Sequence, residues 1–461
     1  MTETATMPET VGAWLKSITG AAAIAAQRRP GGGRREAWLV DAHMPDGSTQ
    51  ELFMRLDRSD PVQSGDPFTL EREARFYAAL QHTDVPVPRL VGSHPDMQAI
   101  LTERVEGEPW FSRLTDETAR VAVASEFMSK LAALHSVDIG RVELDEPRGS
   151  MRECVEADIA RWERLYRFGD APKNPTIEFA LRWLTSHIPD TCDIAPVIVQ
   201  GDTGPGNFLY ADGRVTAVLD WELAHFGDPM ADLGWLALRA VQEPFTDLAE
   251  RFGDYERATG QSVDLARVRY YRIFAELKVV ILGYRRTIDV DLLSEVGNTL
   301  GYEALHGRLL ADALAEECGA EPVLPAPPEI APGGDDWLFE VALAQLKDII
   351  VPGSKDAFVA LRAKGLARII KYLRESDRLR DWRSTCELDA AESILGYRPP
   401  TNVEAAQRVA EMIDEHAIGD PRFVEYLWVC AHVFQELLRP SMGVLAQRRF
   451  DPLPDESVTV H

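Results

Sequence analysis

The sequence predicts an α+β fold, with an antiparallel sheet and helices up to about residue 320 and an all-helical region from residue 335 onward. Short runs rich in β-branched and aromatic residues, separated by turn residues, occur near the N-terminus and again around residue 200, and they indicate strands. Throughout residues 335–461, apolar residues recur at helical spacing instead. The intervening residues 321–334 are rich in Pro and Gly, which indicates a linker between domains.

The length and net charge of the chain limit the number of domains and the classes of binding partner that we expect. The 461 residues suffice for two or three domains. A formal net charge of −25 argues against a nucleic-acid partner and against an anionic membrane, because both bind basic surfaces. The charge would suit a cationic substrate, although solubility alone also explains it. The five cysteines lack C-x-x-C spacing and the N-terminus does not resemble a signal peptide, so we expect a cytoplasmic protein.

The first predicted elements are a short helix over residues 10–18 and strands over residues 37–42 and 51–56. A glycine run that includes Gly32 and Gly33 precedes the first of these strands. Such a loop can cover phosphate groups, because backbone N–H groups without side chains in the way approach them closely. A flexible connection without a ligand is the alternative.

A helix over residues 70–80 follows, and Thr69 is placed to cap it. Glu73 falls among the apolar residues of this helix, and a buried carboxylate needs a partner. Arg55, on the second strand, is our candidate for that partner. The pair would either hold nucleotide phosphates or serve only as a structural salt bridge.

Further elements follow before residue 140. A strand over residues 100–103 leads into a turn at Gly107, and a helix is predicted around residues 124–135. His135 lies at the end of that helix, where we expect a structural role.

The most informative stretch runs over residues 197–232. It holds three short strands, over residues 197–199, 208–210 and 215–219, and Asp212-Gly213 supplies a two-residue hairpin turn between the last two. Asp202 leaves the first strand, Asn207 enters the hairpin and Asp220 leaves it. We therefore expect these three polar residues to meet at one edge of a small sheet.

This trio matches the needs of phosphoryl transfer. That reaction requires a carboxylate to orient or deprotonate the attacking hydroxyl and oxygen ligands for Mg²⁺. An Asp followed five residues later by Asn, and an Asp after the next hairpin, is the arrangement of kinase catalytic loops. The alternative is that these are ordinary turn residues, since Asp, Asn and Gly cluster in turns.

The stretch resembles the aminoglycoside phosphotransferase and choline kinase group. The matching positions are Gly201-Asp202, Asn207, Asp220-Trp221-Glu222, Gly227-Asp228-Pro229 and Asp232-Leu233. One departure is Gln200, where the family usually has His before Gly-Asp. The resemblance covers about residues 10–318 and implies a bilobal, protein-kinase-like fold. Residues 1–107 would form an antiparallel β N-lobe that holds nucleotide, and residues 108–320 a mainly helical C-lobe with the catalytic loop.

The resemblance also implies roles for individual residues. Asp202 would be the catalytic base or orienting carboxylate, and Asn207 and Asp220 would hold Mg²⁺. The residues expected to bind nucleotide are Gly32, Gly33, Arg55, Glu73, Glu103 and Val105, the last two through their backbone at the hinge between lobes. The residues expected to support the catalytic loop are Gln200, Asp228 and Asp232.

Candidates for substrate contact are less defined. Tyr271 and Lys278 share a face of a helix predicted near residues 264–287, where packing alone also explains the aromatic residue. Glu222 and His225 follow the second metal-site Asp, and solvent exposure is the alternative for His225.

The C-terminal residues 335–461 predict a bundle of about four helices without a chemical constellation. This part resembles uncharacterised helical domains fused to bacterial phosphotransferases. We expect it to serve in homo-oligomerisation or docking.

Together these observations predict an ATP- and Mg²⁺-dependent kinase that phosphorylates a hydroxyl group of a small molecule. Arg55 and the string around residues 134–138 resemble the subgroup fused to acyl-CoA dehydrogenases, which implies a hydroxy acid or hydroxyacyl-CoA substrate. One alternative is an aminoglycoside or another cationic amino alcohol. Another is a nucleotide-binding pseudokinase with a scaffolding role, because Gln200 and the glycine loop depart from the family pattern.

Overall fold

The computed structural model describes residues 7–29, 35–59, 65–144, 146–191, 194–290, 292, 295–331 and 333–453. Contacts between residues divide the chain into two units. The first unit comprises Met1–Arg161, Pro189–Tyr271 and Asp451–His461, and the second comprises Trp162–Ile188 and Arg272–Phe450. Among the residues described, no helix combines the length and apolar character needed to cross a membrane.

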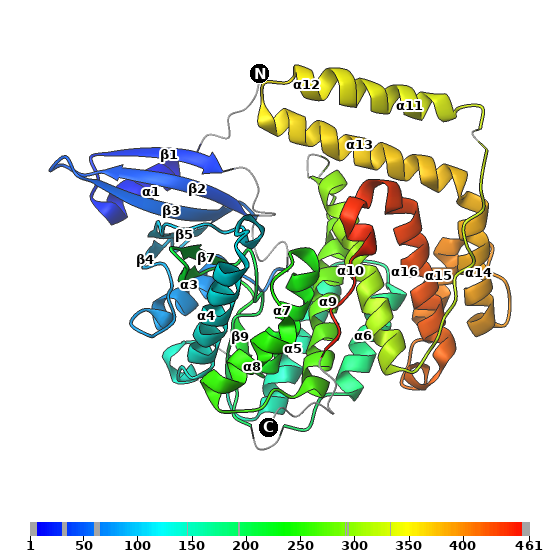
Figure 1. The fold of residues 1–461 in the computed structure, drawn as a ribbon, viewed down its shortest axis with the longest axis horizontal. Helices are drawn as coiled ribbons and strands as arrows, with labels where there is room; N and C mark the ends of the chain where they lie inside the picture. Colours follow the sequence, from blue (N-terminus) through cyan, green and yellow to red (C-terminus); the bar gives the residue numbers. More distant parts are fainter. Residues whose placement is uncertain are drawn as a thin grey trace. The chain divides into compact units, whose positions relative to one another are not determined.

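The first unit begins with a five-stranded antiparallel sheet in the order β1-β2-β3-β5-β4 (Figure 1). Its strands are β1 (Ala23–Arg29), β2 (Glu36–His43), β3 (Thr49–Asp57), β4 (Leu90–Ser93) and β5 (Gln98–Glu103). Helix α1 (Glu9–Thr19) packs on β1 and β4, and helix α3 (Leu70–Leu80) packs on β3, β4 and β5. The antiparallel sheet predicted for this part is confirmed.

Strand β3 lies in the middle of this sheet, between β2 and β5. Leu52, Met54 and Leu56 alternate along it and are buried in the core of the sheet. Arg55 therefore points to the opposite face, toward α3, where Thr69 caps the helix by accepting the backbone N–H of Arg72 at 3.2 Å. The prediction of helix 70–80 with this cap is confirmed.

The residues around position 200 form two separate two-stranded sheets and not one small sheet, so that prediction was wrong. Strand β6 (Val197–Val199) pairs with β9 (His225–Gly227), and β7 (Phe208–Ala211) pairs with β8 (Arg214–Val218). The turn between β7 and β8 is the predicted one, because Asp212 and Gly213 both have positive φ, 51° and 75°. Strand β9 was missed because its three residues are too few for a visible alternation.

Helices complete the first unit. They are α4 (Glu117–His135), the first part of α5 (Met151–Tyr166), α7 (Met230–Gln242), α8 (Leu248–Thr259) and the start of α9 (Leu265–Ile288), with short 3₁₀ turns at Phe111–Arg113 and Ile139–Arg141. Helix α4 packs on β6, β8 and α8. Helix α7 starts three residues after β9, so its first turn lies close to the end of that strand.

The second unit is helical. It contains the end of α5, α6 (Pro175–Ser186), the rest of α9, α10 (Val296–Glu317), α11 (Asp336–Gln345), a π-helical turn (Leu346–Ile350), α12 (Val351–Gly353), α13 (Ala357–Arg378), α14 (Arg380–Leu395), α15 (Asn402–Met412) and α16 (Pro421–Met442), with 3₁₀ turns at Ala417–Gly419 and Gly443–Gln447. Helix α10 packs on α13 and α16, and α15 packs on α6. The prediction of a helical C-terminal region is confirmed. The predicted boundaries at residues 107, 320 and 335 stay a prediction, because a division by contacts does not test which segments fold independently.

Candidate active site

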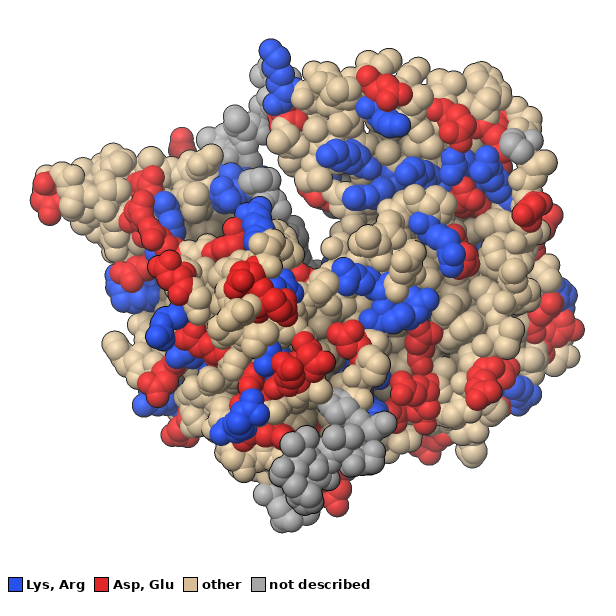
Figure 2. Space-filling view, in the orientation of Figure 1, with Lys and Arg blue, Asp and Glu red and all other residues tan. Residues whose placement is uncertain are grey.

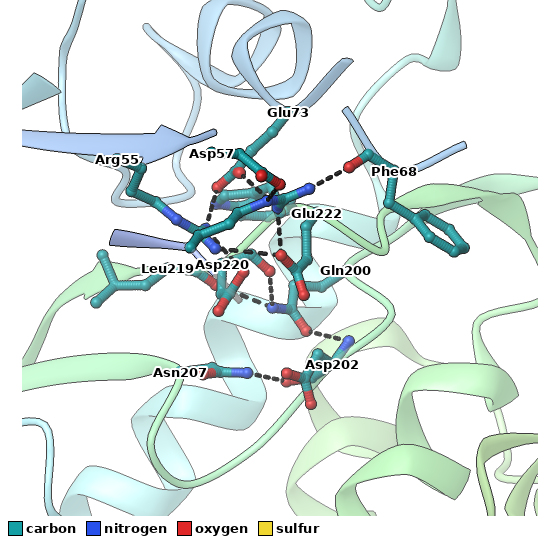
Figure 3. Close-up of polar contacts among 12 residues, drawn as sticks. Arg55, Asp57, Phe68, Glu73, Gln200, Asp202, Asn207, Leu219, Asp220 and Glu222 are labelled. Atoms are coloured by element: carbon teal, nitrogen blue, oxygen red, sulfur yellow. Dashed lines mark hydrogen bonds and ion pairs between the residues drawn. The ribbon is translucent and has the colours of Figure 1, made fainter. Parts of the chain in front are cut away.

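Arg55 is the centre of an ionic cluster in the first unit. Its Nη1 donates to Glu73 Oε1 at 2.7 Å and to Asp220 Oδ1 at 2.9 Å, and its Nη2 donates to Glu222 Oε2 at 3.2 Å. Figure 3 shows the guanidinium reaching toward these three carboxylates. The structure thus brings the predicted strand cation and helix glutamate together. It also joins both to the hairpin residues Asp220 and Glu222.

Arg35 is a second cation in this cluster, and we did not predict it. Its side chain is 3% exposed and donates to Glu222 and to the backbone carbonyl of Phe68. It also lies 3.5 Å from carboxylate oxygens of Asp57 and Glu73. Its place directly after the glycine run was a visible signal, but nothing in the pattern showed that its side chain turns inward.

The environment sets the ionisation of the cluster. Glu73 is fully buried, and burial raises its pKa to about 7, although Arg55 acts against that shift. Burial acts on Asp220 in the same direction, but the charge and hydrogen bond of Arg55, together with the charges of Arg35 and Arg239, outweigh burial and hold the pKa of Asp220 below its ordinary value. Asp220 therefore stays a carboxylate that can accept a cation.

Asp220 also has an unusual backbone, with φ of 59°. A residue with a side chain rarely adopts this left-handed conformation, although Asp tolerates it better than most. Directly before it, the N–H of Leu219 donates to the carbonyl of Asn207 at 2.8 Å. The β7–β8 pairing therefore holds the two predicted metal ligands side by side.

Asp202 lies in the loop between β6 and β7. Its carboxylate accepts the indole N–H of Trp235 and pairs with the guanidinium of Arg239 at 2.9 Å. Burial raises the pKa of Asp202 to about 6, with Arg239 acting in the opposite direction. Asn207 Nδ2 donates to the backbone carbonyl of Asp202 at 2.7 Å, so the two ends of the loop are joined.

Gln200 supports this loop with both ends of its amide. Its Nε2 donates to the carbonyls of Leu219 and Asp220, each at 2.9 Å, and its Oε1 accepts the N–H of Asp202 at 2.8 Å and the hydroxyl of Thr203 at 3.0 Å. A glutamine thus links the residue that leaves the β7–β8 hairpin to the loop that carries Asp202 (Figure 3). Such bonds satisfy buried backbone groups that would otherwise be costly.

Asp232, in the first turn of α7, holds the other side of the loop. Its carboxylate accepts the backbone N–H groups of Gln200 and Gly201, both at 2.9 Å, and the hydroxyl of Thr203. It also lies 3.0 Å from Nε2 of His135, which explains the position of that histidine at the end of α4. These contacts tie Asp232 to the backbone of the loop, and its supporting role in catalysis stays a prediction.

Asp228 is fixed from a different direction. Its carboxylate accepts two N–H groups of Arg267 and the backbone N–H of Met230, the first residue of α7. Gly201 is needed at its position, because φ is 82° and an added Cβ would lie 2.4 Å from the carbonyl oxygen of Leu223.

The remaining predicted residues are more dispersed. Gly32 and Gly33 lie outside the described residues. Glu103 ends β5 and Val105 follows two residues later. Glu222 takes part in the ionic cluster, as described above.

Three predicted substrate contacts remain. His225 is buried, with Nδ1 at 2.9 Å from the carbonyl of Leu223, so the expectation of solvent exposure was wrong. Tyr271 is buried in the first unit, and burial holds its pKa well above the ordinary value. Lys278 belongs to the second unit, where its ammonium lies over the rings of Phe274 and Trp162.

The donor set fits Mg²⁺. This ion takes oxygen ligands and is usually bound through one or two carboxylates together with substrate phosphates and waters. Asp220 supplies a carboxylate with a side chain 30% exposed, and Asn207 supplies an amide oxygen. No group of three or more His, Cys, Asp or Glu side chains that could hold a metal occurs in the part of the chain that the structure describes.

Comparisons with known proteins agree with this geometry. Residues 28–271, more than half of the chain, match the model of the phosphotransferase enzyme family APH. Acyl-CoA dehydrogenase family member 10 of Mus musculus is 30% identical over 180 residues, which are 37% of this chain and 16% of that protein. Family member 11 of Rattus norvegicus is 29% identical over 179 residues, 37% of this chain and 23% of that protein. The chain thus spans less than a quarter of the length of these relatives.

Solved structures of phosphotransferases are also similar. Macrolide 2'-phosphotransferase MphH of Brachybacterium faecium is 23% identical in sequence, and its structure aligns with a TM-score of 0.44. The alignment covers 62% of this chain and 94% of that one. Aminoglycoside phosphotransferase APH(4)-Ia, solved with ADP and hygromycin B, is 19% identical, with a TM-score of 0.43 over 61% of this chain and 92% of that one. With its sheet-containing N-terminal part, its catalytic-loop motif and the match over residues 28–271, the chain belongs to the phosphotransferase enzyme family.

Proposed function

We propose that the protein is an ATP- and Mg²⁺-dependent kinase that phosphorylates a hydroxyl group of a small molecule. The observation that supports this most is the joining of Asp202, Asn207 and Asp220 through one set of hydrogen bonds, beside the Arg55–Glu73 pair. Membership of a phosphotransferase family supports the same class of reaction.

In this proposal each residue has one task. The acceptor hydroxyl oxygen attacks the γ-phosphorus of ATP, the bond from phosphorus to the ADP oxygen breaks, and Asp202 orients the hydroxyl and receives its proton. Asn207 and Asp220 would hold Mg²⁺, which neutralises charge on the phosphates when bound. Arg55 would bind phosphate oxygens, with Glu73 fixing its guanidinium.

For the substrate we propose a hydroxy acid or a hydroxyacyl-CoA. The support is that the relatives are acyl-CoA dehydrogenase family members, whose names associate them with acyl metabolism. A second candidate is an aminoglycoside or another cationic amino alcohol, which the net charge of −25 favours. A screen that measures ADP release across hydroxy acids, hydroxyacyl thioesters and amino alcohols separates the two.

The first test is Asp202→Ala. We expect kcat to fall by at least about a thousandfold, because both the orienting carboxylate and the proton acceptor are lost, while ATP still binds. The measurement is ADP release with the best acceptor of the screen, together with nucleotide binding by calorimetry. The matched control is Asp96→Ala on an exposed turn, which should change neither.

Unchanged turnover by the Asp202 variant would contradict the assignment. ATP binding without turnover across the whole acceptor screen would favour the pseudokinase alternative.

A further inference from the structure

Helix α7 presents two side chains to Asp202 that the kinase motif does not include. Trp235 and Arg239 are four residues apart, so they lie on the same face of the helix. The indole N–H of Trp235 donates to Oδ1 of Asp202. Arg239 Nη2 donates to Oδ2 at 2.9 Å, and Arg239 Nε lies 2.9 Å from Oδ1. Both oxygens of the proposed catalytic carboxylate are therefore engaged.

This arrangement competes with the proposed reaction. A carboxylate offers about four lone-pair positions. Trp235 and Arg239 Nη2 each donate to one of them, and Arg239 Nε lies 2.9 Å from Oδ1 without making a hydrogen bond. A base that orients an acceptor hydroxyl needs an open position on the same oxygens. For Asp202 to act fully, part of the Arg239 contact has to be exchanged for the substrate.

Arg239 has the room for such an exchange. Its side chain is 21% exposed, and its third nitrogen, Nη1, bonds to Gln242 one turn further along α7. Gly204 opposes the stem of Arg239, and an added Cβ at Gly204 would lie 2.8 Å from Arg239 Cβ. The catalytic loop thus leaves space for this arginine through a glycine with φ of 138°.

An anionic group is the natural exchange partner for a guanidinium. Arg can bind a carboxylate through two parallel N–H donors. At Asp202 only Nη2 of Arg239 donates, and its buried Nε makes no hydrogen bond. A cationic group brought to the same place would be repelled, and a neutral amide or ester would leave the charged donors poorly satisfied.

We propose that Arg239 binds a carboxylate of the substrate and in doing so releases Asp202 for the acceptor hydroxyl. Arg239 is then a specificity-determining residue that selects free hydroxy acids over their amides, thioesters and amine counterparts. The inference rests on the proposed kinase function and narrows its substrate class. Because Arg239 and Asp202 are in direct contact, the carboxylate and the hydroxyl of the substrate must be separated by only a few bonds.

The test uses matched acceptors and the full chain with ATP and Mg²⁺. The acceptors are lactate and longer hydroxy acids in which the carboxylate is moved away from the hydroxyl group one methylene at a time. Each acid is compared with two analogues, in which a primary amide or a primary amine replaces the carboxylate. We expect kcat/KM for the best acid to exceed that for its amide by at least about tenfold, since bonds to charged groups contribute that much.

Arg239→Gln should lower kcat/KM for the acid by about tenfold or more and leave the amide within about twofold, which removes the preference. Arg239→Lys should keep part of the preference for the acid over its amide, because Lys retains the positive charge but lacks the two parallel N–H donors. Arg214→Gln is the matched control, since Arg214 lies on β8 with a side chain 81% exposed.

Two results would overturn the inference. One is a wild-type protein without preference between acid and amide, and the other is an equal loss on both acceptors in Arg239→Gln, which indicates only a structural ion pair. Thermal unfolding of each variant shows whether it is folded, and Arg239→Lys carries the test if Arg239→Gln is not. The proposed function fails differently: no acceptor then gives ADP release, or Asp202→Ala leaves it unchanged.

Discussion

At the scale of single residues, Gln200 shows how the loop tolerates a departure from its family. The amide donates to two carbonyls on the β7–β8 side and accepts from two groups of the catalytic loop. A residue in this position therefore needs donors and an acceptor at once. Glutamine provides both, and no change of protonation is required.

Gln200→Glu keeps the size of the side chain and removes its donors. The new carboxylate would face the carbonyl oxygens of Leu219 and Asp220, so we expect kcat to fall at least about tenfold and the free energy of unfolding to fall by about 1–3 kcal/mol. Steady-state kinetics and denaturant unfolding measure these changes. Gln261→Glu, on an exposed loop, should leave both unchanged. Equal behaviour of the two variants would show that the bonds to the carbonyls are not needed.

Asp232 makes the stability of the first unit depend on pH. Burial acts to raise its pKa, but the bonds from His135, Thr203 and the backbone outweigh burial and lower it. A carboxyl whose folded pKa lies below its unfolded value of about 3.9 stabilises the fold above that pH and loses this contribution as the pH falls through the folded pKa.

Asp232→Asn should therefore destabilise the protein at pH 7 by on the order of 3 kcal/mol, because a buried charge network loses its anion. The difference from the unaltered protein should shrink as the pH falls below about 4. Urea unfolding at a series of pH values measures this, and Asp96→Asn, at an exposed position, is the control. A difference that does not change with pH would contradict the argument.

At the scale of elements, helices α10 and α16 of the second unit are joined by a buried polar network. Arg308 on α10 is fully buried and donates to Asp312 at 2.7 Å, to Gln435 on α16 and to the carbonyl of Arg448. Asp312 also accepts the indole N–H of Trp428 on α16 at 2.8 Å. Apolar periodicity predicted that the C-terminal region is helical, but it carries no information on which polar groups meet between its helices.

The substitution Arg308→Met tests how much this network contributes to the free energy of unfolding. It removes the guanidinium and leaves the buried Gln435 and the partly exposed Asp312 without it, so we expect a loss of about 1–3 kcal/mol in the free energy of unfolding. Arg439→Met, on the same α16 with a side chain 61% exposed, should stay within about 0.5 kcal/mol of the unaltered protein. Chemical unfolding followed by circular dichroism measures both. Similar losses in the two variants would mean that the network contributes little.

At the scale of the whole molecule, local signals predicted more than distant ones. The spacing of Asp202, Asn207 and Asp220 could be recognised in the sequence because the three residues lie within one short stretch of chain. Strand β1 was missed because its Ala- and Arg-rich sequence, at one edge of the sheet, contains a single β-branched residue, Ile24. Arg35 was missed because it reaches the site from a segment far away in sequence. Arg239 was missed because the sequence does not show which side chains of the following helix face Asp202.

The surface of the second unit leaves one prediction open. Lys and Arg side chains lie along the region of α13 in Figure 2, on a protein whose net charge is −25. Large apolar residues of α11, the π-helical turn and α13 are exposed, among them Trp337, Ile349 and Phe358. A surface of this kind is typical of interaction sites. The expectation of oligomerisation or docking through the C-terminal helices stays a prediction.

Helix α7 has a consequence for engineering. Its first turn holds the backbone of the catalytic loop through Asp232, and its last turn carries Arg239 against the side chain of Asp202. The loop and the helix therefore form one structural unit. A chimera that takes the loop of another family member without its α7 would lose the contacts of Asp232 with the loop backbone and of Arg239 with Asp202. A chimera should therefore exchange residues 197–242 together, because this segment contains both the loop and α7.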